Sequence, residues 1–283
     1  MGKVSIIMPC FNDGLYIEEA IETVLNQTYK DIELIIINDG STDELTNRIL
    51  NTTQWPSQVK VIQSGGIGPA GARNLGIKTA TGEYILPVDS DDRIDPTYIE
   101  KAVKIMIDNP RVGVVYCQAE LFGEQTGRWD LPNYSLEKML LDNIVFVTAM
   151  FYKKDWEAVN GFNEKMKNGM EDYDFWLSLL EIDREIYQIP EVLFYYRIKP
   201  ISRTTRFQKS MDQVVETYRQ IYLNHPILYS KYKDLYANIL RDELIHQLFL
   251  NRALKESISY IEYLDKFPRL KKIINYFMVK RSK

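Results

Sequence analysis

Apolar and polar positions alternate along the first 110 residues in two regular patterns. Continuous apolar runs predict five strands, at residues 4–8, 32–37, 59–62, 84–88 and 112–117. Between these runs, apolar residues recur at helical spacing and predict four helices, at residues 15–26, 42–53, 69–80 and 95–107. Strands that alternate with helices in this way are typical of an α/β fold, with a mostly parallel sheet and helices on both of its faces.

The pattern becomes more mixed after residue 118. Two helices are expected at 135–141 and 171–181, and two strands at 144–152 and 192–198. From about residue 207 the spacing of apolar residues is helical to the end of the chain. We therefore expect an α/β domain over residues 1–205 and a helical C-terminal extension over residues 206–283.

Unusual polar residues gather where the predicted strands end, which is the edge of a parallel sheet where ligands bind. The strongest example is Asp89-Ser90-Asp91-Asp92, directly after the strand at 84–88. Three carboxylates so close together repel one another unless a cation neutralises them, and carboxylate oxygens suit Mn²⁺ or Mg²⁺. A solvated acidic turn that caps the next helix explains the same residues without a metal. Spacing alone leaves both interpretations open.

Two other acidic positions also allow a structural and a functional interpretation. Asp39 ends a predicted strand, where its carboxylate can accept hydrogen bonds from a ribose or a base, or simply form a turn. Glu171 and Asp172 begin a predicted helix, where acids are stabilised by the helix dipole. A carboxylate at that place can equally remove a proton from a nucleophilic hydroxyl.

Gly66, Gly68 and Gly71 form a G-x-G-x-x-G pattern between a strand and a helix, and Asp89 lies 18 residues after the last glycine. This pattern is typical of dinucleotide-binding sites, so a nucleotide-dependent oxidoreductase is the alternative function. Three features count against it. A complete strand–helix unit precedes the glycines, Arg73-Asn74 occupies the first helical turn, and an acidic cluster replaces the single ribose-binding acid.

Composition narrows the possible classes of protein. Both cysteines, Cys10 and Cys117, lie in apolar runs, which fits a reducing compartment better than a disulfide framework. Both histidines, His225 and His246, lie late, which excludes a Ser-His-Asp triad or a His-rich zinc site within the first 220 residues. No apolar stretch approaches the ~20 residues of a membrane span and no signal peptide is evident, so a cytoplasmic location is expected.

Charge is distributed unevenly along the chain. Residues 1–203 carry 20 Lys and Arg against 31 Asp and Glu, whereas residues 204–283 carry 15 against 8. Residues 268–283 contain six basic residues and no acid, and their apolar residues form a stripe at helical spacing. Such a basic amphipathic helix suits peripheral attachment to an anionic membrane surface, and it equally suits packing of the stripe on the domain.

Taken in order, several motifs resemble those of family 2 glycosyltransferases with the GT-A fold, over about residues 3–205. The motifs are VSIIMPCFN at 4–12, VLNQTY at 24–29, NDGSTD at 38–43, GARNLG at 71–76, GEYI at 82–85, DSDD at 89–92, GFNE at 161–164 and EDYDFW at 171–176. The resemblance implies an inverting, metal-assisted transfer of one sugar from a nucleotide-sugar. The nucleotide that the family resemblance favours is UDP. The implied acceptor is a glycan or lipid-linked glycan in surface polysaccharide synthesis, and no nucleic acid is expected as a partner.

The resemblance also implies a role for each residue of the predicted site. The donor-binding residues are Pro9, Phe11, Asn12, Asp39, Arg73, Asp89 and Lys199. Asp91, with Asp89, is expected to hold Mn²⁺ or Mg²⁺ against the donor diphosphate. Asp172 is expected to be the general base on the acceptor hydroxyl, with Glu171 and Trp176 beside the acceptor.

One position departs from the family pattern. Many members carry His in a Tyr-Arg-x-His segment, where it can complete the metal site, but here Tyr196-Arg197-Ile198 leads to Lys199. A charged lysine cannot ligate a metal, although it can contact a diphosphate directly. The QxxRW signature of processive synthases is absent from the sequence, which favours transfer of a single sugar. Asp91 and Asp172, whose loss would indicate an inactive sugar-binding module, are both present.

Overall fold

The computed structural model describes residues 2–200 and 210–265, with side chains up to residue 252. The chain divides into two compact units, residues 1–231 and 232–283. The sequence predicted a boundary near residue 205, whereas this division leaves two further helices, α9 (Met211–Asn224) and α10 (Pro226–Lys231), with the sheet. The predicted basic segment at 268–283 lies outside the described residues. No helix in the described parts of the chain is both long and apolar enough to cross a membrane.

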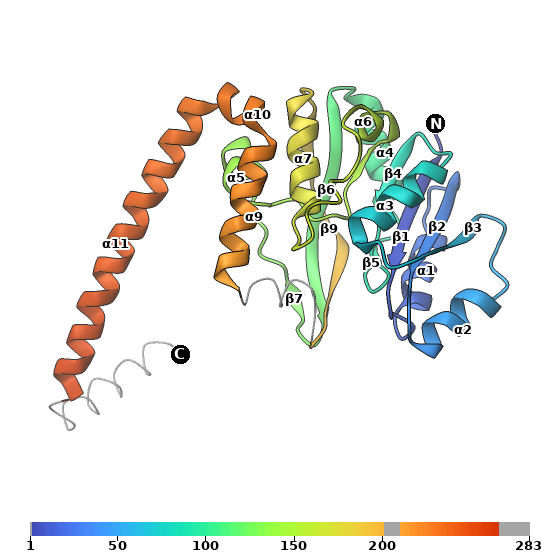
Figure 1. Cartoon of the computed structure of the whole chain (residues 1–283), viewed down its shortest axis with the longest axis horizontal. Helices are drawn as coiled ribbons and strands as arrows, with labels where there is room; N and C mark the ends of the chain where they lie inside the picture. The colour runs from blue at the N-terminus through green and yellow to red at the C-terminus, as the bar shows by residue number, and fades with distance from the viewer. Residues whose placement is uncertain (1, 201–209, 266–283) are drawn as a thin grey trace. The chain divides into compact units, whose positions relative to one another are not determined.

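The first unit is built on one sheet, in which the described strands have the order β3–β2–β1–β4–β8–β6–β9–β5, with β7 paired to β6 (Figure 1). The strands are β1 (Val4–Cys10), β2 (Ile32–Asp39), β3 (Val59–Ser64), β4 (Tyr84–Pro87), β5 (Arg93–Ile94), β6 (Val112–Gly123), β7 (Gly127–Arg128), β8 (Met150–Tyr152) and β9 (Glu185–Ile198). β1, β2, β3 and β4 pair in parallel, as the sequence rhythm predicted. β8 is antiparallel to β4 and β6, so the sheet is mixed beyond β4.

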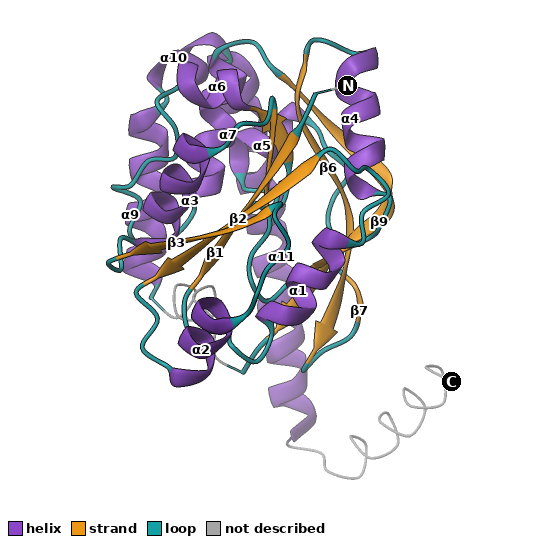
Figure 2. Ribbon diagram, turned by 90° about the vertical axis from the view of Figure 1, so that its right-hand side faces the viewer, coloured by secondary structure: helices purple, strands orange, loops and turns teal. Residues whose placement is uncertain are grey.

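Helices cover both faces of this sheet, with α3 and α7 on one side and α4 on the other (Figure 2). The remaining helices are α1 (Ile17–Leu25), α2 (Glu44–Thr52), α3 (Gly68–Thr79), α4 (Tyr98–Asp108), α5 (Leu136–Leu141), α6 (Lys153–Ala158), α7 (Glu171–Glu181) and α11 (Lys233–Asp265), the last in the second unit. β1 and β2 are apolar at nearly every position because helices bury both faces of a central parallel strand.

The pairing of the strands gathers their ends at one edge of the sheet. The register sets Cys10 beside Asn38 and Ile7 beside Pro87, so the loops that follow β1, β2 and β4 meet there. β9 runs parallel to β6 over its whole length and returns the chain to the same edge, where the Arg197 amide donates to Asp92 Oδ1 at 2.8 Å.

One predicted strand is largely a loop. The apolar run at 144–152 pairs with the sheet only at Met150–Tyr152, and the segment before it is irregular. Its apolar side chains Ile144, Val145 and Phe146 are nevertheless buried. A short continuous apolar run therefore indicates that the segment is buried, and it does not show that the segment is a strand. It lacks the alternation of apolar and polar residues that is typical of a strand.

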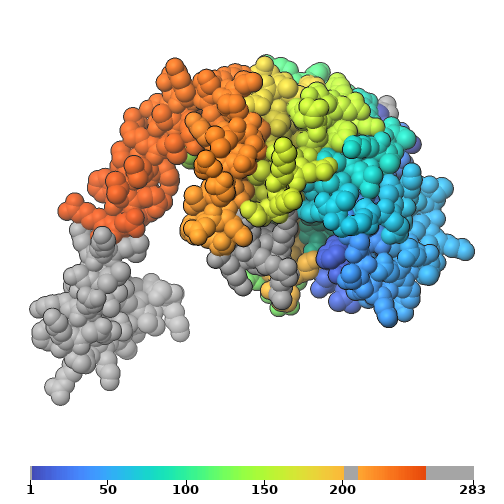
Figure 3. Space-filling model, viewed as in Figure 1, coloured from blue at the N-terminus to red at the C-terminus, as the bar shows by residue number. Residues whose placement is uncertain are grey.

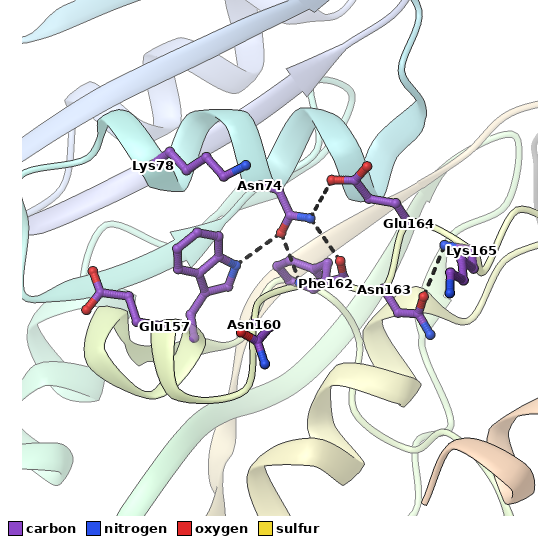
Figure 4. A pocket seen from close by; sticks show the side chains of 9 residues that line it. Asn74, Lys78, Glu157, Asn160, Phe162, Asn163, Glu164 and Lys165 are labelled. Atoms are coloured by element: carbon purple, nitrogen blue, oxygen red, sulfur yellow. Dashed lines mark hydrogen bonds between the residues drawn. The ribbon is translucent and has the colours of Figure 1, made fainter.

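Asn74 of α3 organises the segment that carries the GFNE motif (Figure 4). Its side-chain oxygen accepts from the Trp156 indole at 3.1 Å and from the Phe162 amide at 2.9 Å. Its nitrogen donates to the Phe162 carbonyl and to Glu164. Gly161 adopts φ +77°, and a Cβ on it would lie 2.7 Å from the Asn74 oxygen, so this close approach requires glycine.

Helix α9 is packed against the segment that follows this motif. In the space-filling view the orange surface of α9 meets the yellow-green segment around residue 165 (Figure 3). Asn224 Nδ2 lies 2.6 Å from Asp174 Oδ1 of α7 and 3.8 Å from Met166 Sδ. These contacts explain why α9 belongs to the unit that contains the sheet.

Replacing Asn74 by Ala is expected to lower the free energy of unfolding by about 2–4 kcal/mol, because the buried Trp156 and Phe162 donors each lose their acceptor at about 1–3 kcal/mol. Urea unfolding of the full chain, followed by tryptophan fluorescence, measures the change. Asn51→Ala is the control, since Asn51 accepts one exposed hydrogen bond from Gln63. It should cost under about 0.5 kcal/mol; equal losses for the two variants would refute the role of Asn74.

Candidate active site

A cleft of about 1020 Å³ lies at the sheet edge where the strand ends meet. Most of the predicted site residues line it together: Pro9, Phe11, Asp39, Arg73, Asp89, Asp91, Glu171, Asp172 and Lys199. Trp129 and Leu131, which follow β7, and Met170, which precedes α7, also contribute to the wall. Residues far apart in the sequence therefore form one site.

Asn12 and Trp176 are not among the residues that line the cleft. Asn12 Oδ1 accepts from the amides of Thr42 and Asp43 at 2.7 and 3.1 Å, so Asn12 joins the loops after β1 and β2. Trp176 is 0% exposed, and its indole donates to the Val145 carbonyl at 3.0 Å. A fully buried ring cannot touch an acceptor, so Trp176 supports the wall of the cleft from behind.

Asp39 holds the glycine-rich turn before α3. Its Oδ1 accepts from Ser64 Oγ at 2.7 Å and from the Ile67 amide at 2.8 Å, and its Oδ2 accepts from the Gly68 amide at 2.8 Å. A carboxylate offers about four lone-pair positions, so one remains on Oδ2. The amides that a dinucleotide fingerprint would turn toward a pyrophosphate are bonded to Asp39, which argues against the oxidoreductase alternative.

Arg73 links the two acidic ends of the cleft. Its Nη2 lies 2.7 Å from Asp89 Oδ1, and its Nη1 lies 2.9 Å from Glu171 Oε1. The side chain is 4% exposed. Burial opposes its charge, but Asp89 and Glu171 outweigh burial and raise the pKa of Arg73. Glu171 is therefore first of all the partner of a buried cation.

Lys199 lies between two carboxylates. Its Nζ is 2.5 Å from Asp91 Oδ2 and 2.9 Å from Asp13 Oδ1, and Asp13 Oδ2 accepts from Ser90 Oγ at 2.7 Å. Burial disfavours the ammonium, but Asp91 and Asp13 outweigh burial and raise the pKa of Lys199. The sequence does not predict this role of Asp13, because nothing local links Asp13 to a lysine 186 positions later.

At Asp91, a lysine ammonium competes with the divalent metal that the resemblance implies. In the described parts of the chain no three His, Cys, Asp or Glu side chains are grouped to hold a metal ion. Asp89 is paired with Arg73, and Asp91 with Lys199. Two unit charges about 4 Å apart in a partly buried site repel by about 4 kcal/mol, and a divalent ion beside the ammonium doubles this repulsion.

Asp172 differs from the other carboxylates of the cleft. Among the described residues no ion pair fixes it; instead its Oδ1 accepts from the Tyr173 amide at 2.9 Å and its Oδ2 from Asn143 Nδ2 at 3.1 Å. Burial and the neighbouring Glu171 raise the pKa of Asp172 to about 6, against the opposing effects of Arg73 and of these hydrogen bonds. Met170, at φ +62°, turns the chain into α7 just before these two acids. A carboxylate with this pKa is ionised at neutral pH and is a stronger base than an ordinary aspartate.

Aromatic side chains form the apolar part of the wall. The Trp129 ring lies 4.9 Å from the Tyr196 ring and 6.1 Å from the Phe146 ring, centroid to centroid. Tyr218 of α9 also lines the cleft and donates a hydrogen bond to Asp142. A cleft with carboxylates, two cations and an aromatic wall can bind a polar ligand that also has flat apolar faces.

Comparison with known proteins identifies the family and the fold of this chain. Residues 5–186 match the family model described as glycosyl transferase family 2. A chondroitin synthase of Pasteurella multocida is 32% identical over 188 residues, which are 64% of this chain and 19% of the synthase. The chain thus spans about a fifth of the length of that relative.

Two solved structures share the fold. Staphylococcus aureus TarS (residues 1–349, in complex with UDP-GlcNAc) has a TM-score of 0.66 at 19% identity, over 84% of this chain and 71% of that one. The mannosyltransferase PcManGT of Pyrobaculum calidifontis, in complex with GDP-Man and Mn²⁺, has a TM-score of 0.59 at 18% identity, over 89% and 80%. The expected GT-A fold is confirmed, and the match over residues 5–186 shows that this chain belongs to glycosyl transferase family 2.

Proposed function

We propose that this protein transfers one sugar from a nucleotide-sugar, with UDP as the nucleotide, to a hydroxyl group of a glycan or lipid-linked glycan, with inversion at the anomeric carbon. The observation that carries the proposal is one cleft that holds both Asp172, a carboxylate with a raised pKa, and the cations Arg73 and Lys199. Asp172 can accept a proton, and Arg73 and Lys199 can bind a departing diphosphate. Family membership supports the class of reaction.

The donor end of the cleft is assigned to the loops after β1, β2 and β4. Pro9 and the 56% exposed ring of Phe11 offer a surface for the base, and the free lone pair of Asp39 accepts one N–H from it. Arg73 and Lys199 face the diphosphate. UDP is supported by the TarS complex, although the PcManGT complex contains GDP-Man and Mn²⁺. The Mn²⁺ or Mg²⁺ implied by the resemblance stays a prediction, and no step here depends on it.

The acceptor end is assigned to Asp172 and the aromatic wall. The ionised Asp172 takes the proton of the acceptor hydroxyl while that oxygen attacks the anomeric carbon, and the bond to the diphosphate breaks on the opposite side. Attack opposite the leaving group inverts the anomeric configuration. Asn143 holds the carboxylate in place, and Trp129 with Tyr196 offers a flat apolar surface to a sugar ring.

Replacing Asp172 by Asn is expected to reduce transfer by about 10²–10⁴-fold, because general-base assistance is lost. The affinity for UDP should stay unchanged. Release of UDP from a panel of UDP-sugars with glycan acceptors, analysed together with the product by mass spectrometry, measures transfer. Asp183→Asn, at an exposed position just after α7, is the matched control and should remain active. Full activity of Asp172→Asn would rule out the assigned base.

Replacing Asn143 by Ala is expected to move the rise of kcat with pH to higher pH. Asp172 must be ionised to act as a base, so kcat rises through its pKa of about 6. The hydrogen bond from Asn143 stabilises the ionised carboxylate and lowers this pKa, and its loss raises the pKa. The pH dependence of UDP release measures the shift. Asn168→Ala, another amide in the cleft, should leave the rise where it is; a shift to lower pH in Asn143→Ala would contradict the assignment.

A further inference from the structure

Strand β9 ends beside the loop that carries Asp91, and Lys199 follows it directly. The Lys199 side chain is 23% exposed and lines the cleft between Asp91 and Asp13. We propose that Lys199 is the built-in cation that binds the donor diphosphate in place of a divalent metal, and that Asp13 positions it. The proposal rests on the proposed function, since it assumes a nucleoside-diphosphate donor.

The ammonium has the donors that this role needs. It carries three N–H groups, and among the described residues Asp91 and Asp13 accept two of them. The third is left for a phosphate oxygen in the cleft. The Tyr16 ring, 5.5 Å from Nζ, adds a favourable contact for the cation.

Asp13 fixes both the lysine and the acidic loop. One of its oxygens accepts from Lys199 at 2.9 Å and the other from Ser90 at 2.7 Å, and Ser90 is 1% exposed. Ser90 directly precedes Asp91 in the chain. The Asp13 carboxylate therefore sets the position of Lys199 relative to Asp91. Asp13 is therefore a positioning residue, which acts through Lys199.

Each of the two cations is shared by two carboxylates. Arg73 is paired with Asp89 and Glu171, and Lys199 with Asp91 and Asp13. A metal on Asp91 would have to share this carboxylate with the ammonium, whose Nζ lies 2.5 Å from Oδ2. At position 199, where many family members carry His, this chain has a lysine whose positive charge competes with a metal for Asp91.

Calorimetric titration of UDP into the full chain, in EDTA and in Mn²⁺, tests the proposal. The wild type should bind UDP with affinities equal within about twofold in the two buffers. Lys199→Ala should weaken binding in EDTA by about 10–100-fold, the range for one hydrogen bond to a charged group. Lys101→Ala is the matched control, because Lys101 is paired with Glu191 at 2.6 Å outside the cleft, and it should bind as the wild type.

Two further variants separate the cation from a merely structural role. Lys199→His supplies a neutral imidazole that can ligate a metal, so its UDP binding should become dependent on Mn²⁺, with bound Mn²⁺ detected by electron paramagnetic resonance. Asp13→Asn frees the lysine from one partner, so UDP binding should weaken in EDTA and gain a stimulation by Mn²⁺ that the wild type lacks. Thermal unfolding of each variant confirms that it is folded.

The outcomes distinguish this proposal from the proposed function. Wild-type binding of UDP that requires Mn²⁺, or binding in EDTA that Lys199→Ala leaves unchanged, overturns the role of Lys199 and leaves the transferase intact. If UDP does not bind, GDP and dTDP are titrated in the same two buffers, and the same criteria apply to whichever binds. Failure of all three nucleotides in both buffers overturns the proposed function, and the role of Lys199 with it.

Discussion

The buried guanidinium of Arg73 joins three segments that are distant in the sequence: its own helix α3, the loop after β4 and the first turn of α7. Removing a charge from water costs several kcal/mol unless partners compensate, so the fold can bury Arg73 only when Asp89 and Glu171 are both in place. Asp89 adjoins the Asp91 loop, and Glu171 adjoins Asp172. The same ion pairs that stabilise the buried cation therefore fix the position of the Asp91 loop relative to Asp172.

This pairing also explains why two adjacent acids have different properties. Glu171 is neutralised by Arg73, whereas Asp172 receives hydrogen bonds only from an amide side chain and a backbone N–H among its described partners. Burial and the charge of Glu171 then raise the pKa of Asp172 to about 6. Environment, and not residue type, gives the two carboxylates different properties: Glu171 pairs with a buried cation, and Asp172 is the stronger base.

The sequence predicted the early strands and helices, the edge where they meet and most of the residues in the cleft, because these follow from local periodicity and from motifs at strand ends. It did not predict Asp13 or Asn143, whose partners Lys199 and Asp172 are brought close only by the folded chain. Trp176 was expected beside the acceptor, but its side chain is fully buried. The spacing of its motif does not tell which face of α7 is buried. Contacts between segments that are distant in the sequence decide each of these cases.

The glycine-rich turn before α3 shows how one tertiary contact changes the chemistry of a familiar pattern. A helix N-terminus normally offers its first amides to a phosphate. Here Asp39 occupies the amides of Ile67 and Gly68, and Pro69 has no N–H to offer. A second anion near this turn would meet the Asp39 carboxylate rather than free donors. Under the proposed function, the charge of a bound diphosphate is therefore met by side chains instead of these amides, and Arg73 and Lys199 are cations that line the described cleft.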